Sequence, residues 1–127
     1  MNATEKEMNL ISDYILLPIV ISIVNKNRLE METSTAMLRN LYASAAEIVM
    51  NRMREDLNAV RLQLKELNIC VIDSVETRDH DSVHYPYLLR GQSGRFTIRK
   101  EAVKAEVGRR LSRYITEVIK PEVVVHD

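Results

Sequence analysis

A heptad pattern runs through the middle of this chain and limits the folds open to it. No glycine or proline interrupts residues 33–85, and the hydroxyl side chains at residues 33–35 offer a helix N-cap. We therefore expect one helix from about Thr35 to Leu67. Its apolar residues recur at alternating intervals of three and four, the a and d positions of a helix-to-helix seam. They are Ala43, Ala46, Met50, Met53, Leu57, Val60, Leu64 and Leu67.

This predicted helix is longer than a compact fold of the chain. About 33 residues span roughly 50 Å, whereas a globule of 127 residues is roughly 36 Å across. Either the helix breaks near Asn51 or Asn58, or the molecule is elongated and a second copy covers the seam. A narrow a/d stripe favours the second arrangement, a homodimer. The residues predicted to mediate self-association are Met50, Met53, Leu57, Val60, Leu64 and Leu67.

A second apolar stripe lies near the N-terminal end of the same helix. It consists of Leu38, Leu41, Ala45 and Ile48. With two apolar faces, this half is expected to be buried more completely than the half that follows.

The N-terminal segment carries the apolar run YILLPIVISIV at residues 14–24. We expect a helix from Thr4 to about Val24 that kinks or restarts at Pro18, with residues 25–32 as a connection. Apolar residues cover nearly all sides, so the helix should be buried between other elements.

The same run bears on membranes. Its eleven residues are too few to cross a bilayer, which needs about 20, and no signal-peptide pattern accompanies it. An interfacial anchor is the alternative, although the basic polar face typical of such anchors is missing. We therefore predict a cytoplasmic protein with no membrane partner.

After Asn68 the apolar period becomes that of strands. Residues 69–75 predict one strand, and residues 83–90 and 95–99 predict two more, joined by the four-residue connection Gly-Gln-Ser-Gly. Pairing Arg90 with Arg95 sets the register. One face then carries the core residues Tyr85, Tyr87, Leu89, Phe96 and Ile98, and the other carries Arg90, Arg95 and Arg99.

A last helix is expected from Arg99 or Lys100 to just before Pro121. The tail, residues 122–127, either adds an edge strand or frays. The predicted fold is α+β, a single domain of residues 1–127. Two N-terminal helices, the second long and heptad-patterned, occupy about residues 1–68. A small three-stranded antiparallel sheet and a C-terminal helix occupy about residues 69–120.

Charge is balanced over the whole chain and uneven along it. The 18 basic and 18 acidic side chains cancel, which argues against a globally basic nucleic-acid binder. Residues 90–113 nevertheless hold eight basic side chains against two acidic ones. The arginines of this stretch are the predicted surface for an acidic partner or nucleic acid: Arg90, Arg95, Arg99, Arg109, Arg110 and Arg113.

No motif fixes a reaction. The single Cys70 excludes an internal disulfide framework and a multi-cysteine zinc site. Free cysteines are among the most buried residues, and we expect this thiol to be buried. His80, Asp81 and His84 lack the helical spacing that would bring two histidines onto one metal. No nucleophile, base and orienting group occur at a recognisable spacing. We expect no catalytic residue and no cofactor.

Residues 64–69 followed by a hairpin resemble the recognition helix and wing of winged-helix proteins, but an unbroken helix leaves no turn for the helix-turn-helix. The hypothesis from the sequence is a non-enzymatic cytoplasmic module that self-associates through its long helix and binds an acidic partner through its basic C-terminal part. A nucleic-acid-binding regulator is the alternative, and a small enzyme with a site shared across a dimer is the third option.

Overall fold

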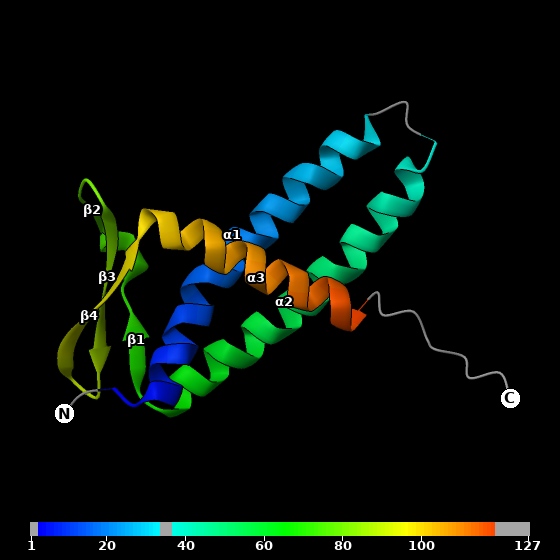
Figure 1. Ribbon diagram of the computed structural model, residues 1–127. Helices are drawn as coiled ribbons and strands as arrows, with labels where there is room; N and C mark the ends of the chain where they lie inside the picture. The colour runs from blue at the N-terminus through cyan, green and yellow to red at the C-terminus, as the bar shows by residue number, and fades with distance from the viewer. Residues whose placement is uncertain (1–2, 34–36, 119–127) are drawn as a thin grey trace, which may run out of the picture.

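The computed structural model describes residues 3–33 and 37–118 and shows an α+β fold (Figure 1). In chain order its elements are α1 (Glu5–Glu32), α2 (Arg39–Glu66), β1 (Ile69–Val71), the short 3-10 helix η1 (Asp73–Val75), β2 (Thr77–Arg78), β3 (Ser82–Leu89), β4 (Gln92–Arg99) and α3 (Lys100–Val118). The predicted fold class is confirmed, with a fourth short strand, β2, between the first two predicted strands. Ser34 and Thr35, part of the predicted cap of the long helix, and the tail beyond Val118 lie outside the described residues.

α1 and α2 lie antiparallel as a long helical hairpin, and α3 crosses both of them (Figure 1). The sheet sits where α1 begins and α2 ends. We call this the sheet end of the hairpin. The opposite end, residues 24–32 of α1 and 39–49 of α2, projects beyond α3, and we call it the open end.

α1 is longer than the sequence indicated. Its first turn is a capping box, in which Thr4 Oγ1 accepts from the Glu7 N–H at 3.1 Å and Glu7 Oε1 accepts from the Thr4 N–H at 2.9 Å. The helix passes through Pro18 on a bent path without ending (Figure 1). The predicted connection at residues 25–32 is therefore wrong. That segment stays helical, and Arg28 bridges Glu32 one turn later at 2.8 Å.

This extra length changes the membrane argument. α1, with 28 residues, is long and apolar enough to cross a bilayer by length and composition. The shortness of the apolar run at residues 14–24 is therefore no longer an argument against a membrane-spanning helix. In the folded chain its apolar side chains pack inward, and Ile11, Leu16 and Val20 are fully buried. The core helix of a soluble protein has this property too. Cytoplasmic location and the lack of a membrane partner stay predictions.

The burial of α2 is the reverse of the prediction. All its buried side chains lie between residues 49 and 64: Val49, Met50, Met53, Leu57, Val60 and Leu64. The N-terminal half, expected to be the more buried, exposes Leu38, Leu41 and Ile48. The reason is that α1, α3 and the sheet cover the later half, whereas the earlier half extends past α3.

The predicted self-association seam is consequently an intramolecular one. Met50, Met53, Leu57, Val60 and Leu64 belong to the chain's own core, and the half-buried Leu67 packs against it. The a/d pattern was read correctly as a helix-to-helix contact, but the covering helix is α1 of the same chain and not a second copy.

β3 is the central strand of the sheet. β1 pairs with its C-terminal part, β2 with its N-terminal part, and β4 with its whole length, all antiparallel. The predicted register is wrong: Leu89 pairs with Gln92 and Tyr85 with Phe96, so the connection is the two-residue turn Arg90-Gly91. Both turn residues have positive φ, 48° and 86°, which a type I′ hairpin turn requires.

The face assignment holds despite this error, because a shift of four residues preserves the alternation of a strand. Val83, Tyr87, Leu89 and Ile98 are buried on the face toward α1. Gly94 lies under the Tyr87 ring, where an added Cβ would stand 2.3 Å from Tyr87 Cζ. A glycine is needed there for packing.

Candidate interaction surface

Arg90 holds the hairpin turn of the sheet against the start of α1. Its Nη1 donates to Glu7 Oε2 at 2.9 Å and to the Leu67 carbonyl at 3.0 Å. Glu7 is only 5% exposed, so its charge needs this partner. The hydrogen bond from Arg90, with that from the Thr4 N–H, lowers the pKa of Glu7 from 4.5 to about 2. Arg90 is therefore a structural residue and not part of a free basic surface.

Arg110 has a comparable role between α3 and α1. Its guanidinium donates to Asp13 Oδ1 at 3.0 Å, to Ser12 Oγ at 3.1 Å and to Glu106 Oε2 at 2.8 Å. Its side chain is only 12% exposed. This arginine too is withdrawn from the predicted partner surface.

The other four predicted arginines remain at the surface. Arg99 pairs with Glu101 at 3.0 Å, Arg109 pairs with Glu106, and Arg113 lies over the Tyr114 ring at 5.7 Å. Arg95 is exposed on the outer face of the sheet, opposite Pro86. The structure thus divides the six arginines between two internal ion pairs and four exposed positions on β4 and α3.

Three polar side chains that the sequence did not connect meet on the outer face of the sheet. His84 Nδ1 lies 2.8 Å from Thr97 Oγ1, and His84 Nε2 lies 2.7 Å from Asp79 Oδ2. Asp79 Oδ1 also accepts from the Ser82 and Asp81 N–H groups. The hydrogen bond from His84 is the main cause that lowers the pKa of Asp79 to about 2. The corrected register, which pairs His84 with Thr97, is the signal that would have found this cluster.

The order hydroxyl, imidazole, carboxylate is shared with hydrolytic triads, but the setting here is that of a loop clamp. Asp79 already accepts two backbone N–H groups, and Thr97 lines neither of the two hollows described below. A substrate cleft and an oxyanion hole would be needed for acyl transfer. We assign the cluster to fixing the segment before β3.

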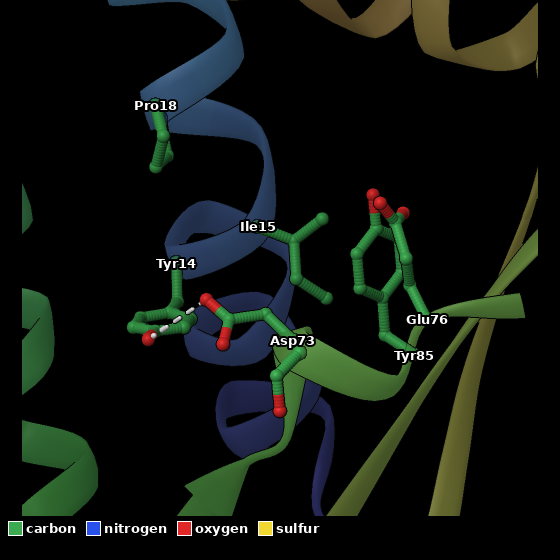
Figure 2. Close-up of a pocket in the computed structure, with 7 residues that line it drawn as sticks. Tyr14, Ile15, Pro18, Asp73, Glu76 and Tyr85 are labelled. Carbon is green, nitrogen blue, oxygen red and sulfur yellow. Dashed lines mark hydrogen bonds between the residues drawn. The ribbon is translucent and has the colours of Figure 1, made fainter.

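A small hollow of about 320 Å³ lies between α1 and the segment from η1 to β2 (Figure 2). Ile15 and Pro18 form its apolar part, and two tyrosine–carboxylate pairs stand on its sides. Tyr14 donates to Asp73 Oδ2 at a long 3.4 Å, and the Glu76 carboxylate lies against Tyr85 (Figure 2). Burial, followed by the nearby carboxylate, raises the pKa of each tyrosine. Both pairs are satisfied within the chain.

Across the parts of the chain that are described, no three His, Cys, Asp or Glu side chains converge as metal ligands. Cys70, predicted to be a buried thiol, is exposed on β1.

The open end exposes several large apolar side chains around a groove. A groove of about 500 Å³ runs between α1, α2 and the end of α3. Its floor includes Val24 and Val49, which are buried, and its sides are formed by Leu38, Leu41, Tyr42 and Ile115. These four side chains are between 45% and 65% exposed. The predicted second stripe of α2 therefore exists, but it faces outward.

α3 is held in place beside this groove. Tyr114 donates to Asp56 Oδ2 at 2.5 Å, and Val107 and Tyr114 are buried against α1 and α2. Leu111, about one turn before Tyr114, and Ile115, directly after it, consequently form a fixed edge of the groove. Such a partly preformed apolar hollow on helices is suited to receiving another helix.

The model of the YhjD protein family matches residues 2–119 of the chain, which covers every element described above. No curated protein matches, and no solved structure matches.

Proposed function

The chain belongs to the YhjD protein family, and for this member we propose a non-enzymatic role as a protein-interaction module that docks a partner on the groove of its open end. The observation that carries the proposal is the exposed apolar side of α2, Leu38, Leu41, Tyr42 and Ile48, beside a groove with an apolar floor. Large contiguous apolar patches on soluble proteins mark interaction sites.

Burial of these side chains supplies a favourable term for binding. Covering a large apolar side chain completely is worth about 1.5–3 kcal/mol, and roughly half of each side chain at the open end is exposed and can still be covered. Four to six of them contribute about 3–9 kcal/mol before the cost of association. A micromolar complex, at about 8 kcal/mol net, therefore also needs apolar surface contributed by the partner.

An apolar fluorescent dye tests this function. At submicromolar protein concentration the wild type should bind the dye, and the variant Leu41→Asp with Ile48→Asp should lose that binding. Both side chains are more than half exposed, so the variant should keep the helical circular dichroism of the wild type. Equal dye binding and equal molecular mass of the two proteins would contradict the proposal.

Acidic-partner and nucleic-acid binding stay predictions from the sequence. They now depend on Arg95, Arg99, Arg109 and Arg113 alone, since Arg90 and Arg110 are engaged in internal ion pairs. Mobility shift over a salt series, with Arg95→Ala and Arg113→Ala, is the measurement that decides them.

A further inference from the structure

We propose that the partner on this groove is a second copy of the chain, and that the open ends of two copies pack as a two-fold symmetric four-helix bundle. This inference rests on the proposed function and specifies its partner. Three features of the open end support it: the continuity of its core, its two-helix shape and its charge.

The groove continues the chain's own hydrophobic core. Val24 and Val49 belong to the buried cluster that includes Leu17, Val20 and Met53, and the same two valines line the groove. Helices laid over the groove would extend this cluster without a break. The contact would then resemble a folded core, which is typical of homodimer interfaces.

The shape of the open end is half of a bundle. α3 crosses the hairpin with Ile115 at the groove edge, and on the far side of this crossing α1 and α2 form a layer of two antiparallel helices (Figure 1). Two such layers placed face to face make the four-helix arrangement in which helices of this kind bury their apolar sides. A two-fold axis allows the same patch to serve both copies.

The charge of the open end suits contact with a second copy of the chain better than contact with a strongly charged partner. Its ionisable side chains are Lys26, Arg28, Glu30, Glu32, Arg39 and Glu47, three basic and three acidic. Of these, Arg28 lines the groove and pairs with Glu32 of its own chain at 2.8 Å. The groove therefore presents no unbalanced charge that a second copy of the chain would repel.

The test is the molecular mass in solution, measured by sedimentation or light scattering over a concentration series. The wild type should be a dimer at micromolar concentration. Leu41→Asp with Ile48→Asp should raise the dissociation constant at least roughly 100-fold, because charges replace an apolar side chain of the groove and one on the exposed apolar side of α2 beside it. Leu62→Asp is the matched control. Leu62 is 62% exposed on the same helix, outside the groove, and its variant should remain a dimer.

The competing occupant is the chain's own segment 119–127, which follows α3 in the sequence and contains three consecutive valines. A wild type that is monomeric, and that binds dye only after truncation at Val118, would assign the groove to that segment and overturn the dimer. A monomeric wild type that binds dye through Leu41 and Ile48 would also overturn the dimer while leaving the proposed function standing. A mass unchanged by Leu41→Asp with Ile48→Asp, together with unchanged dye binding, would remove the inference and the function together.

Discussion

The two ends of the α1–α2 hairpin are built from the same two helices and differ in what covers them. At the sheet end, Leu57, Val60 and Leu64 of α2 face α1, α3 and strands of the sheet and are almost inaccessible. At the open end, Leu38, Leu41 and Ile48 of the same helix are mostly exposed. An apolar stripe therefore shows that a helix face is to be covered, but not which element covers it.

The first prediction sets one end directly against the other. Leu57→Asp places a carboxylate at a position that is 6% exposed, whereas Leu41→Asp places one at a position that is 65% exposed. The buried substitution should cost about 3–5 kcal/mol or more, a large part of the stability of a typical domain. The exposed one should change the free energy of unfolding by about 0.5 kcal/mol or less.

Denaturant unfolding at submicromolar concentration measures both values, since dilution removes any contribution from assembly. Similar losses for the two variants would mean that the ends are equally covered, and the comparison would fail.

The second prediction sharpens the contrast with two glycines. Gly94→Ala puts a methyl group against the Tyr87 ring at the sheet end, where Tyr87 is buried and cannot readily move. We expect a loss of about 1–3 kcal/mol.

Gly108→Ala is its control, because nothing lies within 4 Å of the added carbon. On the exposed side of α3 this change should raise stability by about 0.5–1 kcal/mol. Thermal unfolding of both variants shows whether each substitution lowers or raises the stability. A stabilising Gly94→Ala would show that the ring over Gly94 is loosely held.

The sequence allowed most of the elements to be predicted, because local patterns determine them. The helical periodicity of α2 and α3 and the alternation of β3 and β4 placed these elements within a few residues of their observed bounds. The predicted register of β3 and β4 was wrong because Gly91 and Gly94 both suggested a turn. Only Gly91 serves as one, together with Arg90, while Gly94 is required by the distant Tyr87.

The candidate site was predictable only in part. The stripe Leu38, Leu41 and Ile48 is visible in the sequence, but its exposure depends on where α3 crosses the hairpin, which is a tertiary property. The prediction that Arg90 and Arg110 belong to a partner surface was wrong for the same reason. Arg90 and Arg110 find Glu7 and Asp13 at sequence separations of 83 and 97 residues, beyond the reach of any local spacing rule.

The last prediction concerns the stability that is lost in acid. The folded pKa of Glu7 is about 2, below its ordinary value of 4.5, so between these values the unfolded chain binds more protons than the folded one. The stability that Glu7 contributes is complete above about pH 4.5 and is lost as the pH falls toward 2. Asp79, with a pKa of about 2 against 3.8, adds a second contribution of the same sign.

Glu7→Gln should therefore flatten part of the decline in unfolding free energy between pH 4.5 and 2, and Asp79→Asn should flatten another part. The two effects should add, because Glu7 lies at the start of α1 and Asp79 lies before β3, with no partner in common.

Ile48→Ala at the open end touches neither pair and should keep the wild-type slope. If Glu7→Gln also kept that slope, the ion pair to Arg90 would not hold the sheet against α1. If it flattens the slope as expected, acid weakens the sheet end through these ion pairs, and a contact between two open ends made of apolar side chains should tolerate the same acid better.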